Sequence, residues 1–331
     1  MMDWTDRHCR YFLRGFSPRV LLYSEMITAA AIMRGDAERL LRFSPEEHPL
    51  ALQLGGSDPA LLAGAARLGA QAGYDEINLN CGCPSDRVHA GAFGACLMLE
   101  PARVADCVHA LRAAVDLPVT VKMRIGVVAA APAREQIARF DAEDYARLHA
   151  FAESIVAAGC ETLIVHARKA MLGGLSPREN REVPPLRYEV VERLSHDFPG
   201  VSLVVNGGLR TGEQCLEALR WADGIMLGRE AYHRPQLLAE LHAQLFDDSW
   251  LVPTTATVLE RMGMYAEREL SLGTPLRAIT RHMLGLGSGQ PGARRFRQLL
   301  SAAADTSSGR GARAGQALEL LRAARLCLAS S

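Results

Sequence analysis

Long apolar runs, paired cysteine motifs and leader-like segments are all missing from this sequence. No stretch approaches the roughly 20 apolar residues that cross a membrane as a helix, no Cys-x-x-Cys pair occurs, and the start "MMDWTDRHCR" is charged throughout. The eight cysteines and ten histidines form no cluster with the spacing of metal ligands. We therefore expect a cytoplasmic protein with reduced thiols, no leader peptide, no membrane association and no metal.

Lysine is nearly absent as well. Only Lys122 and Lys169 are lysines among the 37 basic residues. Both lie at the C-terminal ends of predicted strands. A need for a compact ammonium, where a guanidinium fork would not fit, is one explanation. Chance survival under a codon bias toward arginine is the other.

Charge is balanced overall but unevenly placed. Residues 241–331 contain 11 arginines against 7 acidic residues, and the stretch 277–313 contains seven arginines against Asp305 alone. An arginine-rich end on a neutral protein is typical of a protein that binds a polyanion, with nucleic acid as the leading candidate. A solvated helical face is the alternative reading of the same charges.

Short β-rich runs alternate with helical segments over about the first 240 residues. The predicted strands are 20–26, 50–56, 74–82, 118–126, 162–170, 201–208 and 224–230. Strand–helix repetition of this kind indicates a parallel sheet, and its length and period favour a (β/α)8 TIM barrel. Because only seven strands are found, we expect the first strand to be clipped at the N-terminus, with Met1 directly before the first helix.

The chain changes character toward its C-terminal end. No β-rich run follows the barrel pattern, and segments such as "TVLERMGMYAERELSLG" and "AGQALELLRAARLCLA" have helical periodicity. We predict a catalytic barrel over 1–245 and an all-helical domain over 246–331, with 307–315 as a connector. The segment 127–141 is expected to be a long loop on the active face of the barrel.

Polar residues follow the apolar centres of the predicted strands. In a barrel these strand ends converge on one site. The residues found there are Glu25, Met26, Gln53, Asn78, Asn80, Lys122, Arg124, His166, Arg168, Asn206, Gly228 and Arg229.

Glycines end the last two predicted strands, as "NGG" at 206–208 and "LGR" at 227–229. They allow backbone N–H groups to approach a phosphate, and phosphate sites of this fold lie at these two loops. Each could alone be an ordinary turn; on adjacent strand ends, the pair favours phosphate.

The other strand ends suit a flavin mononucleotide (FMN). Gln53 can donate and accept at the ring edge, Lys122 can stabilise the negative charge of a reduced flavin, and His166 can bond to the ribityl or phosphate region. Each alone could also be a satisfied buried polar residue.

The loop "NCGCPSDRVHAG" places Cys83 at the barrel mouth. A disulfide between Cys81 and Cys83 would be strained, and Cys81 is expected to be structural. An unperturbed thiol is mostly protonated at neutral pH and can donate a proton. Reduction of an activated C=C bond needs such an acid beside a hydride donor. A nucleophilic thiolate is the rival role, but no motif supplies its histidine base.

Several long motifs resemble the flavin-dependent tRNA-dihydrouridine synthases. They include "YSEMITAAAI", "YDEINLNCGCPSDRV", "PVTVKMRIG", "VHARKAMLGGLSPRENREVPPL" and "LGREAYHRP". The resemblance covers nearly the whole chain and is greatest to the bacterial A subfamily. It implies an FMN-binding barrel, a helical tRNA-binding domain and NADPH-dependent reduction of uridine to dihydrouridine in the tRNA D-loop, at positions 20 and 20a. We expect a monomer.

The resemblance also assigns roles to residues. It implies that Cys83 is the proton donor and that Asn80 lies at the substrate uridine. The arginines implied to orient tRNA are Arg178, Arg181, Arg294 and Arg297. The implied FMN contacts are Met1, Met2, Gln53, Lys122, His166, Asn206, Gly207, Gly208, Gly228 and Arg229. Phe296, between two of the arginines, is expected to pack in the core rather than to stack on a base.

Two alternatives keep part of this interpretation. An FMN barrel could reduce a small pyrimidine, although a free base would not need an arginine-rich helical domain. A barrel without its first strand could also be a non-catalytic tRNA-binding protein.

Overall fold

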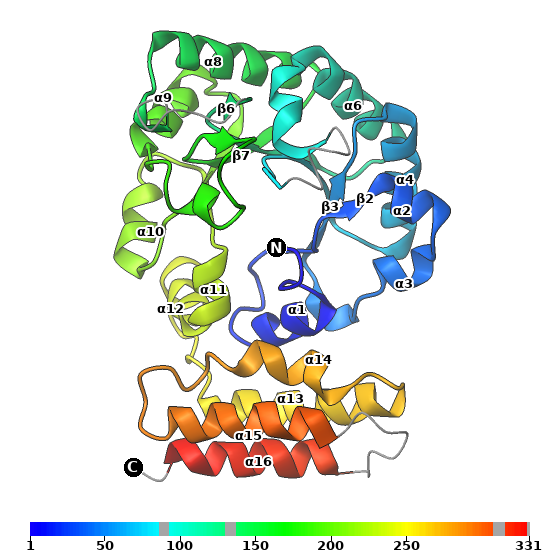
Figure 1. Cartoon of the computed structure of the whole chain (residues 1–331), viewed down its shortest axis with the longest axis vertical. Helices are drawn as coiled ribbons and strands as arrows, with labels where there is room; N and C mark the ends of the chain where they lie inside the picture. Colours follow the sequence, from blue (N-terminus) through cyan, green and yellow to red (C-terminus); the bar gives the residue numbers. More distant parts are fainter. Residues whose placement is uncertain (86–92, 130–136, 307–314, 330–331) are drawn as a thin grey trace. The chain divides into compact units, whose positions relative to one another are not determined.

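The computed structural model describes residues 1–85, 93–129, 137–306 and 315–329 (Figure 1). Part of the cysteine loop, part of the 127–141 segment and nearly all of the predicted connector lie outside these ranges. The chain divides into two compact units. A barrel unit contains Met1, 23–43 and 48–228, and a helical unit contains 2–22, 44–47 and 229–331.

The barrel unit is built on a parallel sheet whose main path has seven strands. These are β1 Leu22–Tyr23, β3 Leu50–Gly55, β4 Glu76–Cys81, β5 Val119–Arg124, β7 Thr162–His166, β9 Ser202–Asn206 and β10 Gly224–Met226. A short strand, β2 Ile27–Thr28, pairs with β3 beside this path. Each of the seven strands on the main path falls inside a predicted run, whereas β2 lies just after one. Helices surround the curled sheet (Figure 1). The predicted barrel architecture is confirmed.

The helices of this unit are bounded by local signals that the sequence contains. They are α2 Ala29–Arg34, α3 Ala37–Leu41, α4 Pro59–Ala72, α6 Pro101–Ala114, α8 Ala142–Ala157, α9 Tyr188–Asp197 and α10 Gly212–Ala218. Helix α4 begins after Asp58, whose carboxylate accepts from the backbone of Ala60 and Leu61, and ends at Gly73 with φ of 99°. Helix α8 begins with a reciprocal capping box between Asp141 and Asp144.

The strand register places the polar residues of neighbouring strands side by side. Gln53 on β3 pairs with Asn78 on β4, and Asn80 on β4 pairs with Lys122 on β5. His166 on β7 lies between Arg124 on β5 and Asn206 on β9. The polar strand ends therefore meet at one edge of the sheet, as the barrel prediction requires.

A second, two-stranded sheet was not predicted. It joins β6 Val127–Val128 to β8 Ala170–Met171 in parallel. The buried side chain of Asn180 accepts from Met171 N at 2.7 Å and donates to Met171 O at 3.0 Å. The described start of the 127–141 segment is thus a strand rather than a loop.

The helical unit combines the first helix of the chain with those after β10. Its helices are α1 Arg7–Arg14, α11 Arg229–His233, α12 Gln236–Leu245, α13 Thr255–Ser271, α14 Leu276–Thr280, α15 Ala293–Thr306 and α16 Gln316–Ala329. Tyr265, Phe296 and Leu321 are among its fully buried side chains, so Phe296 is a core residue, as expected. The limits predicted for independent domains, 1–245 and 246–331, stay a prediction, since these compact units are drawn differently.

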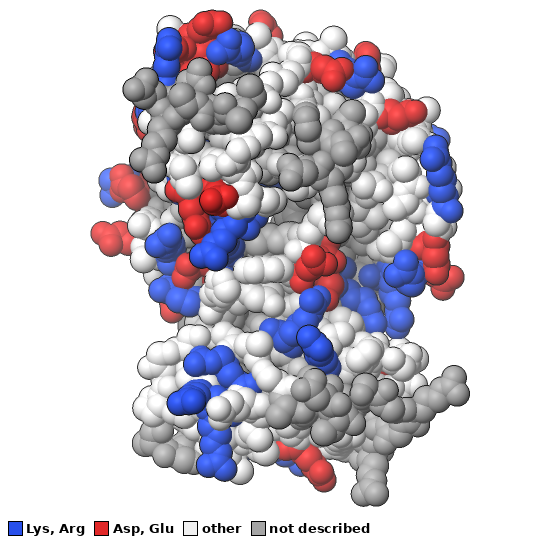
Figure 2. Space-filling model, in the orientation of Figure 1, with Lys and Arg blue, Asp and Glu red and all other residues white. Residues whose placement is uncertain are grey.

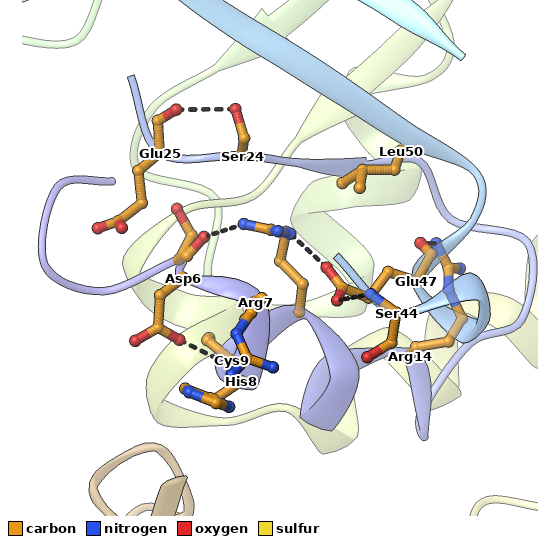
Figure 3. Close-up of polar contacts among 12 residues, drawn as sticks. Asp6, Arg7, His8, Cys9, Arg14, Ser24, Glu25, Ser44, Glu47 and Leu50 are labelled. Atoms are coloured by element: carbon orange, nitrogen blue, oxygen red, sulfur yellow. Dashed lines mark hydrogen bonds and ion pairs between the residues drawn. The ribbon is translucent and has the colours of Figure 1, made fainter. Parts of the chain in front are cut away.

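Ion pairs hold α1 in the helical unit, and Figure 3 shows Glu47 with its partners. Arg10 Nε lies 2.6 Å from Glu47 Oε2, and the other Glu47 oxygen accepts from Ser44 N at 2.7 Å. Arg7 pairs with Glu269 on α13. Burial alone would raise the pKa of Asp6, but its bonds to His282 and Arg281 hold that pKa well below its usual range.

We expect Glu47→Ala to lower the free energy of unfolding by about 3 kcal/mol, because it leaves the Arg10 guanidinium buried without its counter-charge. Urea unfolding followed by circular dichroism measures this change. Glu46→Ala is the matched control. Glu46 and its partner Arg268, 3.4 Å apart, are both exposed, so this substitution should lower the free energy of unfolding by less than about 1 kcal/mol. Equal losses in the two variants would contradict a structural role for the Arg10–Glu47 pair.

Candidate active site

Amide side chains from β3 and β4 form the centre of the candidate site. Gln53 Nε2 donates to Asn78 Oδ1 at 2.8 Å, and Asn80 Nδ2 donates to Gln53 Oε1 at 2.8 Å. Asn80 Oδ1 in turn accepts from the backbone N–H groups of Gly82 and Cys83, each at 3.0 Å. The structure therefore joins three predicted site residues, Gln53, Asn80 and Cys83, in one hydrogen-bonded group.

Lys122 places an ammonium group beside these amides. Its Nζ donates to Asn206 Oδ1 at 3.1 Å, and Asn206 Nδ2 donates to the carbonyl of Met226 at 2.7 Å. These bonds connect the ends of β5, β9 and β10. Burial, followed by the nearby charge of Arg124, lowers the pKa of Lys122 to about 8, while Cys83 acts in the opposite direction. The site thus holds a cation that is poorly solvated and has one acceptor among the residues that the structure describes.

The glycine turn after β9 is required by the packing around it. Gly207 has φ of 110°, and a Cβ there would lie 3.1 Å from His166 Nε2. Gly208 has φ of 74°, and a Cβ there would collide with Leu186 at 2.3 Å. The backbone consequently comes close to His166 at a place where side chains are excluded. This is the kind of cradle expected for the phosphate end of a nucleotide.

Met1 lies at the end of β10. A Cβ built on Gly228 would lie 3.6 Å from the Met1 sulfur, so two of the predicted cofactor residues are neighbours. Met2 and Arg229 belong to the helical unit. Their predicted cofactor contacts remain predictions.

Arg124 lies at the end of a predicted strand, but the sequence assigned no role to it. Its buried guanidinium donates to the carbonyls of Gly82 at 3.2 Å, Lys169 at 3.3 Å and Asn180 at 3.0 Å. It ties the cysteine loop to the segment that carries the 178–181 arginines. Burial lowers its pKa to about 10, so it remains a cation at neutral pH. Its position two residues after Lys122, on the same face of β5, was the signal available in the sequence.

The predicted tRNA-binding arginines are exposed. Arg178 and Arg181 flank the buried Asn180 on one turn, and the Arg178 Nε lies 3.6 Å from Glu182. Arg294 and Arg297 are exposed on α15, on either side of the buried Phe296. Basic side chains outnumber acidic ones where the surface of the helical unit is seen in Figure 2, whereas both signs are interspersed over the barrel unit.

The described ranges also bear on other classes of site. They contain no group of three or more His, Cys, Asp or Glu residues placed to hold a metal ion. None of their helices combines the length and the apolar character needed to cross a membrane.

Comparison with known proteins gives long matches. Residues 1–324 match the family model described as "Dihydrouridine synthase (Dus)". A protein of Pseudomonas syringae pv. tomato named tRNA-dihydrouridine(20/20a) synthase is 55% identical over 301 residues, which are 91% of this chain and 86% of the relative. Proteins with the same name are 52% identical over 322 residues in Pseudomonas putida (97% and 92% of the two chains) and 53% identical over 302 residues in Synechocystis sp. (91% and 86%).

The two lysines of the chain should differ in reactivity. At pH 8 about half of an amine with a pKa of about 8 is neutral, against well under ~1% for an unperturbed lysine. Lys169 is buried, and its Nζ lies 2.5 Å from Asp144 Oδ2. We therefore expect acetic anhydride at pH 8 to label Lys122 about tenfold faster than Lys169 or more, as measured by peptide mass spectrometry.

Two variants serve as controls for this labelling. Lys122→Arg should remove the fast product, and Asp144→Asn should speed the labelling of Lys169 by removing its counter-charge. Equal rates for the two lysines in the parent protein would contradict the lowered pKa of Lys122.

Proposed function

The chain belongs to the dihydrouridine synthase family, and on that premise we propose that it reduces uridine to 5,6-dihydrouridine in tRNA, at positions 20 and 20a. The relatives carry that activity in their names and align with more than nine-tenths of this chain. The structural observation that carries the proposal is the hydrogen-bonded group of Gln53, Asn80 and the Cys83 backbone beside the Lys122 ammonium.

The site residues fit an FMN cofactor by their remaining hydrogen-bonding capacity. Beyond its bonds to Asn78 and Asn80, Gln53 has one further N–H and one further acceptor position, which suits a ring edge that both donates and accepts. Lys122 uses one of its three N–H groups on Asn206. His166 and the Gly207–Gly208 backbone would hold the phosphate end, with Gly228, Arg229, Met1 and Met2 as the other proposed contacts.

In this proposal a bound FMN, once reduced by NADPH, would supply hydride to carbon 6 of the uracil. Cys83 supplies the proton to carbon 5, because its loop leaves β4 at the strand ends where the amides and Lys122 meet. The Lys122 ammonium stabilises negative charge next to the ring. Its lowered pKa indicates that it is poorly solvated, which strengthens such an interaction.

Recognition of tRNA follows from the exposed arginines and from Asn80. A base within the folded D-loop must leave its stack to reach a barrel mouth, where Asn80 is proposed to contact the uracil. The proposed clamps on tRNA phosphates are Arg178, Arg181, Arg294 and Arg297. Action on tRNA also accords with a cytoplasmic monomer, which remains part of the proposal.

The first test is nucleoside mass spectrometry of unmodified tRNA incubated with the protein, FMN and NADPH. We expect dihydrouridine from the parent protein. Cys83→Ala should keep its flavin absorption but lose activity by about 10²- to 10⁴-fold, the usual contribution of a general acid. Cys96→Ala is the matched control, because Cys96 is also half-buried but bonds to the carbonyl of Phe93.

The outcomes of this assay separate the alternatives. Full activity of Cys83→Ala would contradict its role as the acid. Reduction of free uracil or uridine with intact tRNA left unchanged would indicate a small-pyrimidine reductase. Tight tRNA binding without a flavin spectrum or product would indicate a non-catalytic binding protein.

A second prediction concerns the arginines of α15. The double variant Arg294→Ala, Arg297→Ala should weaken tRNA binding by about tenfold at physiological salt and reduce the slope of log affinity against log salt, because two phosphate contacts are lost. Flavin binding should not change. Arg322→Ala, Arg325→Ala removes the same charge from exposed positions of α16. If both pairs weaken binding equally, general charge rather than a clamp on α15 is responsible.

A further inference from the structure

A continuous line of hydrogen-bonded side chains joins strands β3, β4 and β5 of the barrel unit to the backbone of the cysteine loop. It continues from Asn78 to residues that neither the family resemblance nor the proposed function assigns. Asn78 Nδ2 donates to Thr120 Oγ1 at 2.8 Å, and Thr120 Oγ1 donates to Glu76 Oε1 at 2.7 Å. The Tyr23 hydroxyl donates to the same Glu76 oxygen at 2.7 Å. With the bonds described above, the line runs from Cys83 N to Glu76 without a break.

Every hydrogen bond in this line points in the same direction, and the loop end requires that direction. At the loop end, the backbone N–H groups of Gly82 and Cys83 can only donate, so the Asn80 atom that faces them must be Oδ1. Asn80 must then present Nδ2 to Gln53. Gln53 must accept through Oε1 and present Nε2 to Asn78, whose own Nδ2 must face Thr120.

The other end of the line accepts. Burial raises the pKa of Glu76, whose Oε1 accepts from both Thr120 and Tyr23. Because Asn78 Nδ2 donates to the Thr120 hydroxyl, Thr120 must direct its own proton to Glu76. Burial and the Glu76 carboxylate raise the pKa of the Tyr23 phenol, which keeps Tyr23 a donor as well. A rotation of any one amide by 180° would bring two donors or two acceptors face to face inside the barrel.

The line is buried along its length. Asn78 is 0% exposed and Thr120 2% exposed, while Gln53, Glu76 and Asn80 are each below 10%. The register holds its members opposite one another, with Asn78 paired to Gln53 on one side and Thr120 on the other. Water therefore cannot readily replace a missing partner, and an unpaired group here would carry its full desolvation penalty.

We propose that Glu76 and Thr120 are positioning residues, which set the amide orientations of Gln53 and Asn80 and thereby the position of the Cys83 loop. This inference deepens the proposed function and rests on it for the roles of those three residues. One consequence concerns the substrate. Both acceptor positions of Asn80 Oδ1 are taken by the loop, so Asn80 can offer a ligand only its remaining N–H. A donor matches the carbonyl oxygens of uracil and opposes the amino group of cytosine.

The experiment breaks the line at its middle with a residue of similar shape. Thr120→Val removes the hydroxyl, which leaves Asn78 Nδ2 without its acceptor, and Thr120→Ser restores a hydroxyl. Val121→Ala is the matched control, because Val121 is a fully buried neighbour on the opposite face of β5. The readouts are the FMN dissociation constant from flavin fluorescence, the rate at which iodoacetamide alkylates Cys83 in flavin-free protein, and Tm.

We expect Thr120→Val to weaken FMN binding by about tenfold, equivalent to the ~1.4 kcal/mol of roughly one hydrogen bond. The Cys83 alkylation rate should rise about threefold or more, because the loop loses its fixed acceptor. Thr120→Ser should stay within about twofold of the parent protein in both measurements. Val121→Ala should lower Tm with neither effect.

Other outcomes would overturn the inference. If Thr120→Val resembles Val121→Ala, with a lower Tm but parental FMN affinity and alkylation, Thr120 is only a packing residue. If Thr120→Ser fails as Thr120→Val does, the hydroxyl is not the operative group. Alkylation requires neither tRNA nor turnover, so a parent protein that forms no dihydrouridine would refute the proposed function while the alkylation comparison still decides the role of the line.

Discussion

The register of the parallel sheet is the constraint on which the candidate site depends. Strands β3, β4, β5, β7 and β9 pair so that the polar residue near the end of one strand lies beside that of the next. Because side chains alternate between the two faces of a strand, a slip of one residue would turn each polar group toward the helices and bring an apolar residue inward. The amide group, the lysine and the glycine turn are therefore consequences of one set of backbone pairings.

That register also brings two cations together in a place with little water. Burial and the nearby charge of Arg124 lower the pKa of Lys122, and burial with the charges of Arg181 and Arg168 lowers that of Arg124. Arg124 is satisfied by three backbone carbonyls, whereas Lys122 has one amide oxygen as its described acceptor. Positive charge of this kind favours binding of an anionic group and disfavours the empty site. The folded barrel is thus electrostatically prepared for a ligand with negative charge.

Much of this arrangement could be predicted from the sequence, because it depends on local patterns. The seven strands are apolar runs with polar ends. Gln53, Asn80, Lys122 and His166 lie in the C-terminal halves of four of these strands. The rest depends on tertiary contacts. Strands β6 and β8 have two residues each, too few for any periodicity. Asn180 resembles any loop asparagine until the backbone atoms it bonds are known, and nothing near Arg10 in the sequence indicates that its partner is Glu47.

The helical unit is built from segments that lie far apart in the sequence, and this affects how the chain folds during synthesis. Arg7 pairs with Glu269, which lies 262 residues later, and all of the barrel unit except Met1 lies between these two residues in the sequence. On the ribosome, α1 emerges early and Glu47 follows soon afterwards, but the partners of α1 on α13 are made only near the end of synthesis. During that interval the buried Tyr11 of α1 lacks Tyr265, on which its ring stacks in the folded protein. A nascent chain of this protein therefore presents an apolar N-terminal segment that chaperones can bind until synthesis reaches the last helices.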